Sequence, residues 1–199
     1  MAANPAIVNS CKNCSARCCR GLAVVLTIPE ALRLQQALSA PPEALFELSE
    51  NVDSRKTPHY PILARQGRQV REFFIIIKRE GADSHGAAGN IGSPVSTLGH
   101  PAAPCDCIFL NEDLACKIYA HRPYVCRLYP YELEGKNVKK GALCPVKFER
   151  EKGAEEDAKR LAQDLSEHGK MAREWSASHS EAPQIGRLLE YFRGRGNAI

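Results

Sequence analysis

The sequence has little that marks the common classes of membrane, nucleic-acid-binding or catalytic protein. Its apolar stretches, such as Phe73 to Ile77, are far shorter than the roughly 20 residues that a membrane-spanning helix needs. The formal net charge of +4 is small and the basic residues form no stripe, so we expect no membrane contact and no clear nucleic-acid partner. A P-loop, a G-x-G-x-x-G turn and a Ser/His/Asp pattern are also missing, so the sequence identifies no catalytic residue.

A secretory signal is missing as well, because the first residues, MAANPAIVNS, have neither a basic start nor an apolar centre. We therefore expect a cytoplasmic protein. In the cytoplasm disulfides are disfavoured, and clustered cysteines more often bind metal or carry out redox chemistry. A hydrophobic fraction of 44% in a chain of 199 residues is enough to bury a core.

Cysteine is what the chain does have: there are nine, and eight of them form two groups. Thiolate is a soft ligand that suits zinc and iron–sulfur centres, so we interpret both groups as metal ligands. Cys105 is the ninth cysteine and is predicted to lie outside the ligand set. The predicted ligands are Cys11, Cys14, Cys18 and Cys19 in the first group and Cys107, Cys116, Cys126 and Cys144 in the second.

Spacing alone does not select the metal or the number of ions. Cys18 and Cys19 are adjacent and cannot easily point at one ion, which favours a multinuclear site or leaves one of them as a buried thiol. The radical SAM pattern fails because Gly21 stands at its third cysteine position, and the bacterial ferredoxin run fails because of Arg17. Three hypotheses stay open: an iron–sulfur protein with a redox or group-transfer role, a structural zinc module that binds a partner, and a metal-handling protein.

Local patterns predict an α+β fold, with a small irregular metal-centred domain of short strands and helices followed by C-terminal helices. Thr27 and Glu30 form a capping box, which begins a helix. The β-branched run from Val70 to Lys78 predicts the clearest strand. Short hairpins are predicted over residues 107–119 and 131–140.

The remaining segments predict loops and a helical extension. Residues 53–68 are polar and predict turns, and residues 81–104, rich in Gly, Ala, Ser and Pro, predict a long loop. Two helices are predicted to follow, the first from about Glu149. We accordingly divide the chain into a cysteine-cluster domain, residues 1–148, and a helical extension, residues 149–199, whose helices are candidates for binding a protein partner.

Several motifs together resemble a known family. C-x2-C-x3-C-C is followed by T-I-P-E, C-I-F-L, A-C-K-I-Y and H-R-P-Y-V-C-R-L-Y-P-Y, and this order resembles the CxxCxxCC family of zinc- or iron-chelating proteins, the YkgJ-like cysteine-cluster proteins. The resemblance covers roughly residues 11–145 and implies that the same eight cysteines hold an iron–sulfur cluster or Zn²⁺. Related domains in flagellin lysine methylases suggest one chemistry. Because three residues rather than two precede the paired cysteines, the resemblance leaves open which of Cys18 and Cys19 takes the family position.

Two arginines beside the second cysteine group are candidates for binding the cofactor. Arg122 and Arg127 could donate N–H groups to cluster sulfurs or neutralise excess thiolate charge. The alternative for both is a surface ion pair. The neighbouring tyrosines are expected to serve packing rather than radical or acid–base chemistry.

We predict that Cys116→Ser and Cys126→Ser each lower metal content and melting temperature together, because a ligand that binds only the folded state stabilises it. Cys105→Ser is the matched control and is expected to change both quantities little. Metal analysis and thermal melting of the three variants check this. Full metal retention with unchanged melting in both ligand variants would contradict the assignment.

Overall fold

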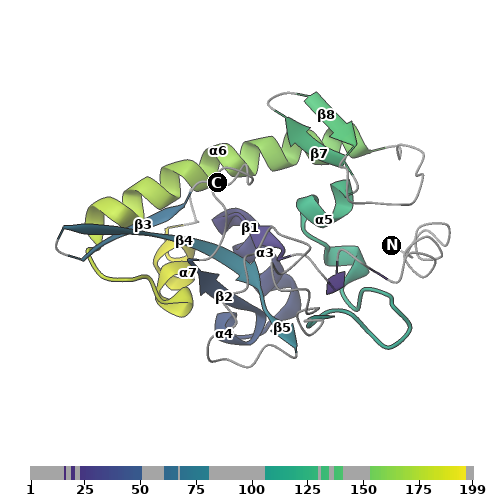
Figure 1. The fold of residues 1–199 in the computed structure, drawn as a ribbon, viewed down its shortest axis with the longest axis horizontal. Coiled ribbons are helices and arrows are strands. Elements are labelled where there is room, and N and C mark those ends of the chain that lie inside the picture. Colours follow the sequence, from purple (N-terminus) through teal and green to yellow (C-terminus); the bar gives the residue numbers. More distant parts are fainter. Residues whose placement is uncertain are drawn as a thin grey trace, which may run out of the picture.

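The structure is a computed structural model that describes residues 16, 19–20, 23–50, 61–66, 68–80, 106–129, 131–134, 137–140 and 153–195. Antiparallel strands occupy the centre, and the long helix α6 runs along one side of them (Figure 1). Helix α7 covers one end, whereas the short helix α5 and the β7–β8 hairpin lie near the other (Figure 1). The predicted mixed α+β fold is confirmed.

The central strand is β4 (Gln69–Ile77), and three other strands pair with it antiparallel. The last five residues of β4, from Phe73 to Ile77, are all buried, which explains the continuous apolar run. The strand predicted over this run is therefore confirmed. The three partners are β1 (Val25–Leu26), β2 (Phe46–Ser49) and β3 (Ile62–Gln66), with Leu26 opposite Ile75, Phe46 opposite Ile77 and Ile62 opposite Phe73.

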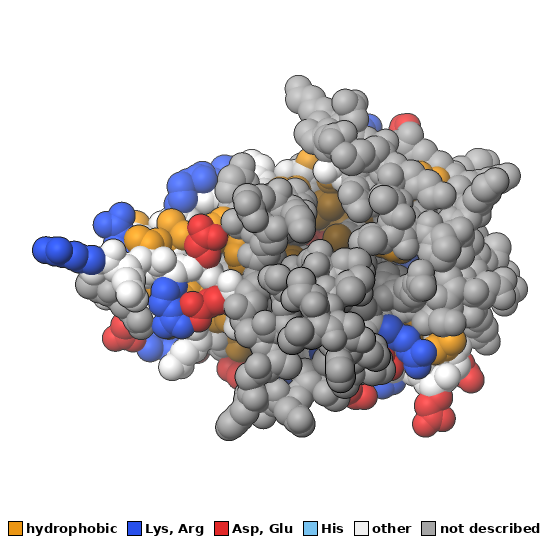
Figure 2. All heavy atoms as spheres, viewed as in Figure 1, with side chains coloured by type: hydrophobic (Ala, Val, Ile, Leu, Met, Phe, Trp, Pro, Cys, Tyr) orange, Lys and Arg blue, Asp and Glu red, His pale blue; other side chains and the backbone are white. Residues whose placement is uncertain are grey.

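Strand β3 corrects the sequence-based prediction of turns over residues 53–68. The polar residues on either side of it hide a short strand, whose backbone groups pair with β4 and whose apolar residues Ile62 and Ala64 point into the core. The alternate residues Leu63 and Arg65 face outward and are exposed. Figure 2 shows Lys and Arg side chains at the end of the molecule where β3 and β4 meet, so charged groups face the solvent there.

Helix α3 (Ile28–Leu38) begins at the predicted capping box. The Glu30 backbone N–H donates to Thr27 Oγ1 at 3.1 Å, and the Thr27 N–H donates to Glu30 Oε2 at 3.2 Å. The helix ends where Ser39 adopts a left-handed conformation with φ of 49°. A second short helix, α4 (Pro42–Leu45), then leads directly into β2.

The two C-terminal helices complete the hydrophobic core. Helix α6 (Ala154–Ser178) begins five residues after the predicted start, and α7 (Ile185–Arg193) follows it. Trp175 of α6 and Leu188 of α7 belong to the same buried cluster as Leu26 and Ile75 of the sheet. The core therefore extends across the predicted boundary at residue 148. Among the described residues, no helix is both long and apolar enough to cross a bilayer.

Small elements carry the second half of the cysteine motif. The predicted hairpin over residues 131–140 is confirmed, whereas the one over residues 107–119 is reduced to a tight turn with a single bridge between Leu110 and Cys116. The predicted loop over residues 81–104 lies outside the described residues. The elements are β5 (Arg79–Glu80), β6 (Asp106–Cys107), the 3₁₀ helix η1 (Tyr119–His121), α5 (Tyr124–Leu128), β7 (Tyr131–Glu134) and β8 (Asn137–Lys140).

We predict that Leu188→Ala lowers the free energy of unfolding by about 2 to 5 kcal/mol, because it leaves a cavity in a fully buried position shared by α7 and the sheet. Val70→Ala, at a side chain that is 55% exposed, is the control and should change it by less than about 0.5 kcal/mol. Denaturant unfolding followed by both fluorescence and circular dichroism checks this. Two separate transitions would show that the C-terminal helices unfold independently of the sheet.

Candidate metal centre

The structure describes four of the eight predicted ligands: Cys19, Cys107, Cys116 and Cys126. Each of them is half-buried. Cys19 lies in a short helical turn, Cys107 on β6, Cys116 opposite Leu110 and Cys126 in α5. The other predicted ligands, Cys11, Cys14, Cys18 and Cys144, lie outside the described residues, as does Cys105.

The N-terminal cysteine segment lies against the start of the second one. Arg79 is the pairing partner of Cys107 in the β5–β6 ladder, and its Nη2 donates to the carbonyl oxygen of Arg20 at 2.9 Å. Arg20 Nε in turn lies 3.5 Å from Asp106 Oδ1. These contacts bring the chain beside Cys19 next to the chain beside Cys107, although nearly ninety residues separate them in sequence.

A hydrogen-bonded turn joins Cys107 to Cys116. The Leu110 N–H donates to the Cys107 carbonyl at 2.8 Å, and the Lys117 N–H donates to the Phe109 carbonyl at 2.8 Å. Inside the turn, Asn111 Oδ1 accepts from the Ala115 N–H at 2.8 Å. Cys107 and Cys116 both pack against the edge of the hydrophobic core, so the core fixes the base of the turn.

Both cysteine segments contain a residue in a conformation that side chains rarely adopt. Leu114 has φ of 61° and Ala16 has φ of 51°; among the described residues, the one other non-glycine residue with positive φ is the helix cap Ser39. A left-handed backbone costs an L-residue of this kind roughly 1–2 kcal/mol. Neither position is a glycine, so the surrounding structure must hold these bends in place.

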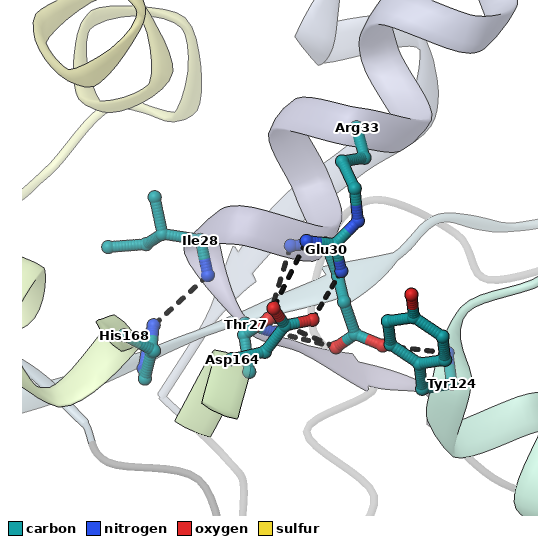
Figure 3. Close-up of polar contacts among 7 residues, drawn as sticks. All are labelled: Thr27, Ile28, Glu30, Arg33, Tyr124, Asp164 and His168. Atoms are coloured by element: carbon teal, nitrogen blue, oxygen red, sulfur yellow. Dashed lines mark hydrogen bonds and ion pairs between the residues drawn. The ribbon is translucent and has the colours of Figure 1, made fainter. Parts of the chain in front are cut away.

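Cys126 is positioned by contacts of α5 with the rest of the molecule. Its N–H donates to the Pro123 carbonyl at 3.0 Å, which begins the helix. The N–H of Tyr124, the first residue of α5, has no acceptor within the helix and donates to Glu30 Oε1 of α3 at 2.8 Å (Figure 3). The start of the helix that carries Cys126 is therefore held by a side chain almost a hundred residues earlier.

Glu30 is buried, with 3% of its surface exposed, and caps two helices at once. Its Oε2 accepts from the N–H and hydroxyl of Thr27, at 3.2 and 3.1 Å, while Oε1 accepts from Tyr124. Burial raises the pKa of this carboxyl, and the nearby charge of Asp164 raises it further; the hydrogen bonds from Thr27 and Tyr124 oppose that rise. The sequence predicted the contact with Thr27, but nothing in it pairs position 30 with position 124.

Helix α6 contacts both the start and the middle of α3. The Ile28 N–H donates to Nδ1 of the buried His168 at 3.1 Å, so this imidazole nitrogen is the one without a hydrogen. Arg33 Nη1 donates to Asp164 Oδ1 at 3.1 Å (Figure 3). A histidine inside a helix gives no sequence signal that it will cap another helix, so His168 was not among the predicted functional residues.

The two arginines predicted to bind the cofactor have different partners. Arg127 forms a two-point ion pair with Asp157 of α6, through Nε–Oδ2 at 3.1 Å and Nη2–Oδ1 at 2.9 Å. Arg122 donates from Nε to the Tyr119 carbonyl at 3.3 Å and lies over the Tyr119 ring. Arg127 thus forms the ion pair considered as its alternative, and the cofactor role of both arginines stays a prediction.

The chemistry of the donor set fits zinc or iron, since all four described members are thiols. Within the described ranges, no three His, Cys, Asp or Glu side chains are gathered as a complete ligand set.

A cavity lies away from the described cysteines. It has a volume of about 640 Å³ and lies between β3 and the end of α6. Leu63, Arg65, Arg173 and His179 are among its lining residues, and no cysteine is. Cys107 and Cys126 belong to the segment from β6 to α5, at the other end of the fold (Figure 1).

Comparison with known families agrees with this chemistry. The family model CxxCxxCC, described as "Putative zinc- or iron-chelating domain", matches residues 10–145, which is more than half of the chain. The match includes all eight predicted ligands. No curated protein and no solved structure matches the chain.

We predict that Glu30 makes stability depend on pH in the direction opposite to an exposed, ion-paired carboxylate. Because its folded pKa is raised above the usual 4.5, its contribution is complete below pH 4.5 and is lost as pH rises through the folded pKa. The free energy of unfolding of the wild type minus that of Glu30→Gln should therefore fall between about pH 4 and the raised pKa. Denaturant unfolding across this range measures it.

Glu47→Gln, which removes one negative charge from an exposed position on β2, controls for the change in net charge. A difference between wild type and Glu30→Gln that grows as pH rises would mean that Glu30 is stabilised as a carboxylate, against the expected direction.

Proposed function

The chain belongs to the CxxCxxCC family, and from this premise we propose that it holds an iron–sulfur or zinc centre through its eight clustered cysteines. The family description supports binding of zinc or iron. An iron–sulfur centre with a redox or group-transfer role is the form that we favour, because the adjacent pair Cys18 and Cys19 suits a site with more than one ion. The cytoplasm, where thiols stay reduced, is the proposed location.

The observation that carries the proposal is the contact between the two cysteine segments. Arg79 and Asp106 hold Arg20, next to Cys19, against the strand that contains Cys107. A single centre with ligands from both groups requires this approach, and apolar packing alone does not explain it, since the contacting groups are charged or polar and lie partly exposed.

The strained turns support the same proposal. Ala16 lies between two predicted ligands, Cys14 and Cys18, and Leu114 lies two residues before Cys116. Metal–thiolate bonds are strong enough to offset a backbone cost of roughly 1–3 kcal/mol at each bend. A metal site must hold its sulfurs in a set geometry, so strained backbone close to the ligands is expected there.

When bound, an iron–sulfur cluster would supply electron transfer, and a zinc ion would supply structural cross-linking. The protein's own residues have a separate task. Glu30 joins α3 to the start of α5, and His168 joins α3 to α6, so these two contacts help to place the backbone that carries Cys126. The core keeps the inner side of Cys107 and Cys116 out of water.

The second candidate is a structural zinc module that binds a protein partner through its C-terminal helices. The same bends favour it, because a zinc ion could hold them without redox chemistry. The apolar sides of α6 and α7 already pack into the core, so a partner would contact their outer, charged sides. A metal-handling protein is the third candidate and would exchange its ion rapidly.

We predict that protein purified without oxygen contains iron and acid-labile sulfide, and absorbs broadly in the visible range with loss of colour on reduction. Cys19→Ser and Cys107→Ser, one from each group, should each lower the metal content and the melting temperature, because one centre depends on both segments. Elemental analysis, sulfide analysis and absorption spectra measure this, with Cys105→Ser as the matched control.

Zinc without sulfide, in colourless protein that unfolds on chelation, would favour the structural module. If both serine variants kept the wild-type metal content, the proposed ligand set would be wrong.

A further inference from the structure

We propose that a pocket between α3 and α5 binds a small oxyanion group, a carboxylate or a phosphate, on the ligand that the metal centre serves. The inference rests on the proposed function, which it extends from the metal to its substrate. The pocket has a volume of about 160 Å³. Its lining includes Arg33 of α3 and Arg122 and Arg127 from the segment around α5.

Arg122 is held in a fixed orientation, and its outer donors meet no carboxylate among the described residues. Its Nε donates to the Tyr119 carbonyl at 3.3 Å, and its guanidinium carbon lies 3.7 Å from the centre of the Tyr119 ring. In the part of the chain that the structure describes, no carboxylate pairs with it. A guanidinium fixed through Nε and its flat face presents the remaining N–H groups as a planar fork, the geometry that matches carboxylate and phosphate oxygens.

The other two guanidinium groups provide a positive surround rather than the binding fork. Arg33 is paired with Asp164 and Arg127 with Asp157, so each charge is largely balanced by α6. Both lie near the Tyr124 ring, with guanidinium carbons 5.2 and 5.5 Å from its centre. Among the described residues of the pocket, Arg122 is therefore the arginine without a carboxylate partner. One uncompensated positive charge favours a bound group of low negative charge.

Glu30 also lines the pocket and would repel an anion if it were free to turn toward it. Both of its oxygens are engaged, Oε2 by Thr27 and Oε1 by Tyr124, so the carboxyl is fixed in its helix-capping position (Figure 3). His121 lines the pocket as well and is exposed. The volume suits a single anionic group together with water, rather than a whole nucleotide.

The position of the pocket in the chain links it to the metal centre. Arg122 follows η1, whose first residue donates its N–H to the Cys116 carbonyl at 3.2 Å, and it precedes Cys126 by four residues. An anion bound at Arg122 would therefore be held by the segment that joins two predicted ligands. This arrangement would anchor the charged end of a substrate beside the centre.

The test measures binding of inorganic phosphate and of acetate to the full-length protein as purified, with sodium chloride at matched ionic strength as the reference. Nitrogen-15 spectra follow the Nε–H signals of the arginines, and the Arg122 signal is assigned by its loss in Arg122→Gln. We expect the Arg122 signal to shift to saturation with at least one of the two anions. Saturation by phosphate alone or by acetate alone identifies which group the substrate carries.

Variants separate recognition from folding and from metal binding. Arg122→Gln should weaken anion binding at least tenfold, and Arg122→Lys, which keeps the charge but loses the fork, should weaken it less. Arg160→Gln, at an exposed arginine of α6 paired with Glu156 outside the pocket, should leave it within twofold. Because this proposal assigns Arg122 to an anion in place of the cluster sulfurs, the metal content of Arg122→Gln should equal that of the wild type.

Absence of a saturable shift with either anion, or equal affinity in Arg122→Gln and wild type, would overturn the inference. Loss of metal in Arg122→Gln with anion affinity unchanged would also overturn it and would assign Arg122 to the cofactor instead. Wild-type protein that binds phosphate or acetate at Arg122 but contains no metal would refute the proposed function while leaving the anion site in place.

Discussion

The arrangement of the helices around the candidate metal centre depends on the buried carboxyl group of Glu30. It accepts hydrogen bonds from the N-cap residue of α3 and from the first residue of α5, two helices that belong to distant parts of the sequence. Without it, the backbone N–H groups of Thr27 and Tyr124 would lose their partner, and each unsatisfied buried donor costs roughly 1–3 kcal/mol. Helix α5 spans only Tyr124–Leu128, too short to be stable alone, so its place in the fold follows from this contact and from packing.

Stability and metal binding reside in different parts of the molecule. A single large cluster joins the sheet to α3, α6 and α7, and it contains the most deeply buried side chains, such as Phe46 and Leu188. The described cysteines lie at the edge of this cluster or beyond it, on short elements whose backbone includes left-handed residues. The core can therefore form the scaffold, while a bound metal would determine the conformation of the segments at its edge.

Helix α6 organises the charges on that side of the fold. Asp157 and Asp164 lie two turns apart on the helix and bind Arg127 and Arg33, which flank the ring of Tyr124. Ion pairs of this exposure contribute little to stability. They instead fix the orientation of two guanidinium groups and neutralise their charge. Arg122 is then the arginine of the pocket without a described carboxylate partner.

The sequence by itself determined the features that depend on neighbouring residues: the capping box at Thr27, the apolar strand before Lys78, the hairpin at residues 131–140 and the thiol chemistry of the cysteine motifs. It missed β3, because the short apolar run from Ile62 to Ala64 stands among polar and turn-forming residues, and only pairing with β4 makes it part of a strand. Tertiary structure alone decided that Glu30 caps α5, that His168 caps α3 and that Arg20 meets Asp106. Each of these contacts joins residues more than eighty positions apart, and no local pattern records which distant donor a buried acceptor will meet once the core has formed.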